Sequence, residues 1–192
     1  MTRIIAGRAK GTRLATPSGD NTRPTADRVR EALFSSVVAW NGSVDVATGE
    51  QLAGLRFLDL FAGSGAVGLE ASSRGADQVT LVESHRKAVQ VIRGNATAAR
   101  LPVQIVENTV KRFCAQPATA AHDVVWADPP YDLAEDELSN LLGSLATNGW
   151  LAPDALIVVE RSSRSPVPHF PGGAEGWRKD YGSTSVHYCQ VD

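Results

Sequence analysis

The 192-residue sequence predicts an α/β fold with a doubly wound, mostly parallel seven-stranded sheet that ends in an antiparallel C-terminal hairpin. From residue 56 onward, short apolar segments alternate with helical patterns, which is typical of parallel strands joined by crossover helices. A glycine-rich turn follows the first of these strands. Two final runs, at 176–182 and 184–190, meet at a glycine and predict the hairpin.

The length and composition are those of one main globular domain with a small appendage. Hydrophobic residues make up 43% and charged residues 21%, and no apolar run approaches the roughly 18 residues that cross a bilayer. The N-terminus has no apolar stretch of the kind found in secretion signals, so we expect a cytosolic protein. Cys114 and Cys189 stand far apart, and we expect neither a disulfide nor a zinc site.

Positive charge is concentrated at one end of the chain. The net charge is −2, yet residues 1–30 hold seven basic and two acidic side chains, against twelve and nineteen in the remainder. Such a concentration favours contact with a polyanion, although a solvated basic tail is the alternative. The candidate contacts are Arg3, Arg8, Lys10, Arg13, Arg23, Arg28 and Arg30.

Residues 1–54 are expected to form an N-terminal extension, before a main domain at 55–192. Residues 3–15 indicate two short strands around a glycine turn. A helix follows, with Thr25 as its N-cap, and we expect Arg28 and Arg30 to lie off its packing face. The apolar side chains at helical spacing are Val29, Leu33, Val37 and Trp40. Residues 41–54 indicate a polar connection.

The main domain contains the alternating elements of the predicted sheet. Parallel strands are expected at 56–61, 78–83, 103–107, 123–127 and 155–160. Helices are expected at 67–74, 85–100, 109–114 and 134–145.

A glycine-rich loop predicts a nucleotide-like ligand. Gly63, Gly65 and Gly68 have GxGxxG spacing after a strand and at the start of a helix, where backbone N–H groups can face a ligand. Glu83 ends the next strand, where a carboxylate can accept hydrogen bonds from both hydroxyls of a ribose. Alone, these residues fit a nicotinamide dinucleotide as well as an adenosyl ligand.

Two further features favour the adenosyl ligand. Asp59 lies in the strand before the glycines, where its carboxylate would repel a pyrophosphate but attract the ammonium group of a methionine. The 137 residues from Arg56 onward are too few for two nucleotide-binding halves and a substrate domain. The sequence therefore predicts S-adenosylmethionine as the cofactor.

The motif Asp128-Pro129-Pro130-Tyr131 follows a buried strand, at the edge where open α/β sheets bind ligands. Two prolines stiffen the turn and fix the carbonyl directions. Hydrogen bonds to the Asp128 side chain and the Pro129 carbonyl would orient the lone pair of an exocyclic purine amine toward a methyl donor. Tyr131 offers a ring for stacking of the extruded base. Alternatively, the prolines only end the strand and Asp128 caps the next helix.

Other chemistries lack their residues. The four histidines show no spacing typical of metal ligands, and we expect no metal. A Pro-Cys dipeptide is absent from the sequence, so the cysteine nucleophile needed to methylate pyrimidine carbons is missing.

The segments 59–68 and 128–131, together with Glu83, resemble the Rossmann-like S-adenosylmethionine methyltransferases that act on amino nitrogens. The blocks at 3–7, 23–34 and 181–184 more narrowly resemble the RsmD family, bacterial 16S rRNA guanine-N2 methyltransferases. This resemblance runs nearly end to end. Its N-terminal blocks separate the sequence from adenine-N6 DNA methyltransferases, which share the motif at 128–131.

The resemblance implies a site and a partner. It implies catalytic residues at Asp128, Pro129, Pro130 and Tyr131. The implied cofactor-binding residues are Asp59, Phe61, Ala62, Gly63, Ser64, Gly65, Glu83, Ser84, Asn108 and Thr109. The implied substrate is 16S rRNA in the small ribosomal subunit or an assembly intermediate. Arg161 and Arg164 are candidates for a second basic rim that contacts the RNA. We expect a monomer. A DNA adenine-N6 methyltransferase and a non-catalytic RNA-binding module are the alternatives.

Overall fold

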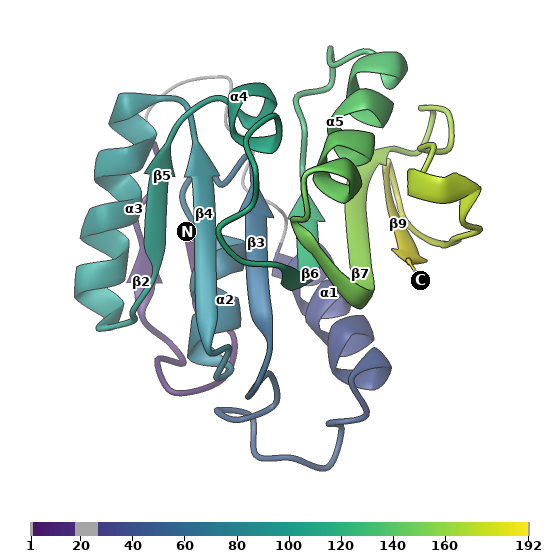
Figure 1. Ribbon diagram of the computed structural model, residues 1–192. Helices are drawn as coiled ribbons and strands as arrows, with labels where there is room; N and C mark the ends of the chain where they lie inside the picture. The colour runs from purple at the N-terminus through teal and green to yellow at the C-terminus, as the bar shows by residue number, and fades with distance from the viewer. Residues whose placement is uncertain (1, 18–26, 192) are drawn as a thin grey trace.

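The computed structural model describes residues 2–17 and 27–191 (Figure 1). Its main sheet has seven strands in the order β5-β4-β3-β6-β7-β9-β8. Five are parallel, and β9 runs antiparallel to both β7 and β8, so the predicted fold class is confirmed. The strands are β3 (Arg56–Leu60), β4 (Gln78–Glu83), β5 (Gln104–Glu107), β6 (His122–Ala127), β7 (Leu151–Ser162), β8 (Trp177–Tyr181) and β9 (Thr184–Gln190).

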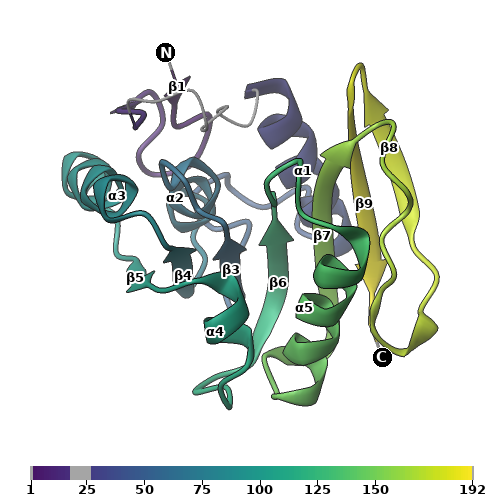
Figure 2. The same cartoon turned by 90° about the horizontal axis from the view of Figure 1, so that it is seen from above.

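Helices cover both faces of the sheet, as Figure 2 shows from above. On one face lie α1 (Asp27–Trp40), α2 (Ala66–Ser73) and α3 (Arg86–Ala99). On the other lie α4 (Val110–Cys114) and α5 (Glu135–Thr147), and a short 3₁₀ turn, η1 (Pro171–Gly173), precedes β8. Because the chain runs from β3 outward through β4 to β5 and then returns to β6, its direction across the sheet reverses between β3 and β6. In open α/β sheets such a switch point opens a crevice at the carboxyl ends of the strands.

Side chains that alternate along β6 build two separate cores. Val124 and Trp126 pack toward α1 and α2, whereas Val125 and Ala127 pack toward α4 and α5. Both cores are dry at their centres: each of these four side chains is at most 1% exposed. A strand covered on both faces is held rigidly, and it therefore fixes the position of the loop that follows Ala127.

Helix α1 belongs to the same core as the sheet. Its residues Leu33, Phe34 and Val37 are fully buried and share a cluster with Trp126 of β6. The predicted packing face is thus confirmed, while the predicted Thr25 cap lies outside the described residues. The expectation that Arg30 lies off this face is wrong. Arg30 precedes those residues by three, four and seven positions, so it falls on the same stripe of the helix, and its side chain is fully buried.

The N-terminal hairpin is confirmed, although its strands are short. β1 (Thr2–Arg3) pairs antiparallel with β2 (Arg13–Leu14). Ile4 and Leu14 pack against Leu69 of α2 and Ala99 of α3, so the hairpin lies on the outer side of these helices. Residues 41–54 contain only turns, as predicted, and none of the described helices could cross a membrane.

Candidate active site

The predicted site residues of the main domain gather at the carboxyl edge of the sheet. Glu83 is the last residue of β4, Asn108 follows β5, and Asp128 follows β6. Between them, a loop at 61–65 joins β3 to α2. This loop and Asp128 flank the switch point between β3 and β6.

Glycine is required at two positions, one in the loop and one in α2, for different reasons. Gly65 has φ of 76°, and an added Cβ would lie 3.1 Å from Ile92 of α3. At Gly68 an added Cβ would lie 2.7 Å from Leu81, which is closer than real Cβ atoms approach. Gly65 thus allows the turn, and Gly68 lets α2 pack directly on β4. Phe61 also has a positive φ, 62°, which is a strained conformation for a side chain of this size.

Glu83 is fixed by two backbone groups. Its Oε2 accepts a hydrogen bond from Gly63 N–H at 2.8 Å, and its Oε1 accepts one from His85 N–H at 2.7 Å. Each carboxylate oxygen has two lone pairs, so both oxygens keep capacity for a further hydrogen bond. The side chain is therefore held in one orientation, with acceptor capacity left on both oxygens.

Asp59 is a buried carboxyl with one unused oxygen. It is 1% exposed, and its Oδ2 accepts a hydrogen bond from Gly68 N–H at 2.9 Å. Its Oδ1 is buried and has no hydrogen-bond partner within the described part of the chain. Burial raises the pKa of Asp59 to about 8; the Gly68 hydrogen bond opposes this rise, and the charges of Asp128 and Glu83 add to it. The Asp128 and Glu83 charges that add to this rise create a negative potential at this edge of the sheet, which attracts a cation.

The loops after β4 and β5 close the other side of the site. Asn108 N–H donates to the Glu83 carbonyl at 3.1 Å, and Asn108 Oδ1 accepts from Thr109 N–H at 2.9 Å. Thr109 is the N-cap of α4, because its hydroxyl accepts from Arg112 N–H at 3.3 Å. Ser84 is exposed beside Glu83.

The segment after β6 is buried near the sheet and exposed at Tyr131. Pro129 is buried, Asp128 is half-buried and the Tyr131 side chain is 64% exposed. Since α5 begins at Glu135 with Ala134 as N-cap, Asp128 does not cap this helix. The capping part of the alternative interpretation is thereby excluded.

Arg161 of β7 holds this segment through hydrogen bonds from its guanidinium group. Its Nη2 donates to the Leu133 carbonyl at 2.9 Å, and its Nη1 donates to the Pro130 carbonyl at 3.4 Å. The Glu135 carboxylate lies 3.9 Å from the same guanidinium, whose side chain is only 5% exposed. Arg161 thus supports the segment that carries the motif, and the prediction that it forms an RNA-facing rim is wrong.

The family model described as conserved hypothetical protein 95 matches residues 2–190. The chain belongs to this family. One relative in it is ribosomal RNA small subunit methyltransferase D of Escherichia coli, which is 39% identical over 170 residues, 88% of this chain and 79% of the relative. The predicted RsmD family and the methyltransferase class are therefore confirmed.

Solved structures agree with this family. Protein yhhF of Escherichia coli superposes with a TM-score of 0.81 at 35% identity, covering 100% of this chain and 98% of the other. The fold alone is shared with the 16S rRNA N2 methyltransferase RsmC of Thermus thermophilus, solved with S-adenosylmethionine and guanosine. That likeness has a TM-score of 0.63 at 17% identity, over 92% of this chain and 45% of RsmC.

In this RsmD-family chain most of the predicted basic contacts are exposed. The exposed ones are Arg3, Arg8, Lys10, Arg13, Arg28 and Arg164. Arg23 lies outside the described residues. Arg30 is fully buried, so the prediction that it contacts RNA is wrong.

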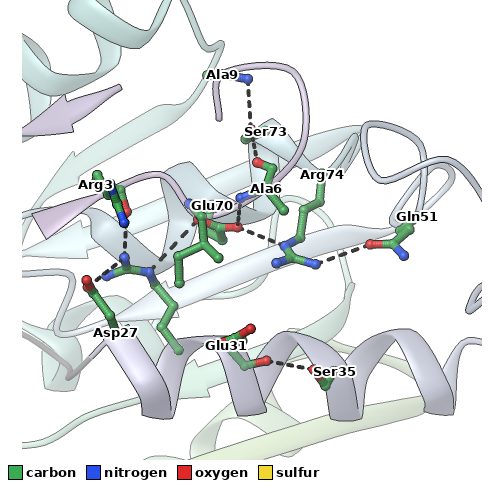
Figure 3. A network of polar contacts seen from close by, with 12 residues as sticks. Arg3, Ala6, Ala9, Asp27, Glu31, Ser35, Gln51, Glu70, Ser73 and Arg74 are labelled. Carbon is green, nitrogen blue, oxygen red and sulfur yellow. Dashed lines mark hydrogen bonds and ion pairs between the residues drawn. The ribbon is translucent and has the colours of Figure 1, made fainter. Parts of the chain in front are cut away.

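Three partners accompany the burial of Arg30: its Nη2 donates to the Arg3 carbonyl at 2.6 Å and to Asp27 Oδ1 at 3.0 Å, and Glu70 lies further away. Glu70, which the sequence did not indicate, lies in the polar network of Figure 3. The Glu70 carboxylate in α2 is fully buried and accepts hydrogen bonds from Ile5 N–H at 2.7 Å and Ala6 N–H at 2.9 Å. It also accepts from Arg74 Nε at 2.9 Å and lies 3.9 Å from Arg30 Nε. One carboxylate therefore holds the N-terminal hairpin, α1 and α2 together. The signal was an acid in an otherwise uncharged helix, followed by arginine at i+4.

Proposed function

We propose that this chain is an S-adenosylmethionine-dependent methyltransferase that methylates the exocyclic N2 of a guanine in 16S rRNA. The observation that carries the proposal is the placement of three features at one switch point. The glycine loop and Glu83 lie on one side of the crevice, and Asp128 to Tyr131 lie on the other. Ligand and target base can therefore meet between β3 and β6.

The residues present fit the proposed cofactor. Asp59 supplies a buried acceptor, Oδ1, that no described residue uses, in a region of negative potential suited to an ammonium or sulfonium charge. Glu83 supplies the ribose acceptors, and Asn108 with Thr109 borders the place of the adenine. When bound, S-adenosylmethionine supplies a methyl group on a positively charged sulfur.

The motif residues prepare the acceptor amine. The amine of guanine is a weak nucleophile because its lone pair is delocalised into the ring. Its two N–H groups donate to the Asp128 carboxylate and the Pro129 carbonyl, which turns the lone pair toward the methyl group and stabilises the positive charge that develops on nitrogen. The positively charged nitrogen then releases one proton to water, and the Tyr131 ring stacks on the base.

The RNA substrate is proposed from the relatives and from charge. The Escherichia coli relative is named as a methyltransferase of small-subunit ribosomal RNA. Exposed Arg3, Arg8, Lys10 and Arg13 lie on the hairpin, so residues 1–54 serve as the RNA-binding extension and grip phosphates without reading bases. The substrate is the small subunit or an assembly intermediate, and the enzyme acts as a cytoplasmic monomer without a metal.

The test is nucleoside mass spectrometry of 16S rRNA from cells that lack this protein. We expect the loss of one N2-methylguanosine, restored by the wild-type chain and not by Asp128→Ala. Restoration by Asp128→Ala would support a non-catalytic RNA-binding module. If the 16S rRNA is unchanged and the same measurement on DNA from these cells shows a loss of N6-methyladenine, the adenine methyltransferase is supported instead.

A further inference from the structure

Asn95 joins the basic N-terminal hairpin to the glycine loop. It lies in α3, is 3% exposed, and makes hydrogen bonds on two sides. Its Nδ2 donates to the Ala15 carbonyl at 2.9 Å and to the Ser64 carbonyl at 2.9 Å, while its Oδ1 accepts from Ala15 N–H at 2.8 Å. One amide thus contacts a residue just after β2 and a residue between the first two glycines.

The partners determine how this amide is oriented. Two carbonyls face Nδ2 and one N–H faces Oδ1, so the opposite orientation would set oxygen against oxygen and nitrogen against nitrogen. Both donor hydrogens are in use. Ala15 holds both polar atoms of the amide, so a displacement of Ala15 that carries the Asn95 side chain with it withdraws the donor from the Ser64 carbonyl.

On the cofactor side, Asn95 fixes a peptide group in the ligand-binding loop. The Ser64–Gly65 peptide is held at both ends, since Ser64 O accepts from Asn95 and Gly65 N–H donates to Ala62 O at 2.7 Å. The preceding residue, Gly63, is held by Glu83. The direction of the loop N–H groups toward a ligand thus depends in part on α3.

On the RNA side, Asn95 holds the end of the basic hairpin. Other contacts dock the same hairpin without touching the glycine loop, and Figure 3 shows two of them. Ser73 Oγ accepts from Ala9 N–H at 3.0 Å and donates to Ala6 O at 2.6 Å, and Glu70 accepts from Ile5 and Ala6 N–H. Within the described residues, Asn95 is the side chain whose hydrogen bonds reach both the hairpin and the loop.

We propose that Asn95 is a positioning residue that couples RNA binding at the hairpin to cofactor binding at the glycine loop. RNA that holds the hairpin in place also holds Ala15, which keeps Asn95 on the Ser64 carbonyl and the loop in its binding conformation. By linkage, the cofactor tightens RNA binding by the same factor. This inference rests on the proposed function, because it requires both ligands.

The experiment measures the affinity of S-adenosylhomocysteine, which allows no turnover, by calorimetry with and without unmethylated small ribosomal subunits. For the wild-type chain we expect the dissociation constant to fall at least about fivefold when the subunit is bound. In Asn95→Ala, which keeps a strong helix former in α3, the ratio should approach one. Asn95→Asp retains the acceptor for Ala15 N–H but lacks both donors, and it should behave in the same way.

Ser73→Ala is the matched control. It loosens the same hairpin without removing a hydrogen bond to the loop, so it should weaken RNA binding and keep the wild-type ratio. A wild-type ratio of one would overturn the inference, and so would a wild-type ratio in both Asn95 variants or an equal loss in Ser73→Ala. If the wild-type chain bound neither ligand, the proposed function itself would fail, which is a different result.

Discussion

The carboxylate of Glu83 accepts a hydrogen bond from the N–H of Gly63 at 2.8 Å, although twenty residues separate them in the chain. This bond ties the end of β4 to the loop after β3, so Glu83, the proposed ribose acceptor, and the glycine turn form one unit. The same carboxylate binds His85 N–H, which fixes it on the other side. The proposed cofactor site is therefore organised before any ligand arrives.

Replacing Glu83 with glutamine tests this unit. In Glu83→Gln an NH₂ group replaces one of the two carboxylate oxygens that accept backbone hydrogen bonds. One hydrogen bond and one proposed ribose acceptor are therefore lost. We expect S-adenosylmethionine affinity, measured by calorimetry, to fall by about 10-fold to 100-fold. Glu107→Gln, at the register partner of Glu83 in β5, removes the same charge from an exposed position and should leave affinity near the wild-type value. Equal losses in both variants would contradict the assignment.

Asp59 predicts a proton release on cofactor binding. With a pKa of about 8, Asp59 holds a proton in the free protein at neutral pH. A cation beside Oδ1 favours the ionised form and lowers that pKa. Calorimetry in buffers of different ionisation enthalpy should show release of about one proton per S-adenosylmethionine at neutral pH. Asp59→Asn should show none; a release that persists in this variant would assign the proton to another group.

The same pKa has a consequence for stability. Because the pKa of Asp59 in the folded protein lies above its ordinary value of 3.8, the stability that its protonated form contributes is present at low pH and is lost as the pH rises through about 8. Asp59→Asn removes this dependence. We expect the stability of the variant relative to wild type, measured by urea unfolding without ligand, to increase from about pH 4 to about pH 8. A constant difference would show that Asp59 does not titrate in this range.

Arg161 should affect catalysis more than binding. Arg161→Lys keeps the charge near Glu135 but lacks the planar fork that reaches the carbonyls of Pro130 and Leu133. A small displacement of the motif should lower kcat about tenfold and leave S-adenosylmethionine affinity unchanged, measured by initial rates and calorimetry. Arg164→Lys, at an exposed position, is the control. A lower cofactor affinity without a change in kcat would show that Arg161 does not position the motif.

The basic hairpin predicts a salt dependence. Replacing Arg8, Lys10 and Arg13 together with glutamine removes three exposed charges from the RNA-binding extension. The slope of log affinity for RNA against log salt concentration should become shallower by about two to three, at up to 0.9 per phosphate contact. Cofactor affinity, measured in parallel, should stay constant. An unchanged slope would place the RNA elsewhere on the protein.

The elements that build the site were predictable from local sequence patterns. Glu83 and Asp128 each follow or end an apolar run, and parallel strands bring such positions to one edge. The glycine spacing placed the turn correctly, because its φ angles and close contacts depend on nearby residues. Strand β7 begins at Leu151, earlier than predicted, because Leu151 pairs with His122 on the far side of an irregularity in the register.

The corrections concern charged residues whose partners are distant in sequence. The concentration of basic residues in positions 1–30 predicted Arg30 as an RNA contact, and Arg161 was predicted as part of a second basic rim. Besides Asp27 in its own helix, Arg30 has as partners the Arg3 carbonyl and Glu70, which is 40 positions away. Arg161 binds the carbonyls of Pro130 and Leu133, about 30 positions away. Periodicity within one helix or strand cannot report such pairs. Asn95 was missed for the same reason, since its partners lie 31 and 80 residues away.

We propose that the protein methylates N2 of a guanine in 16S rRNA at the site between β3 and β6. The most direct measurement incubates the purified chain with unmethylated small ribosomal subunits and S-adenosylmethionine labelled on its methyl group, followed by digestion and identification of the labelled nucleoside. We expect label in N2-methylguanosine with the wild-type chain and none with Asp128→Ala. Label in N6-methyladenosine, or equal labelling by the two proteins, would contradict it.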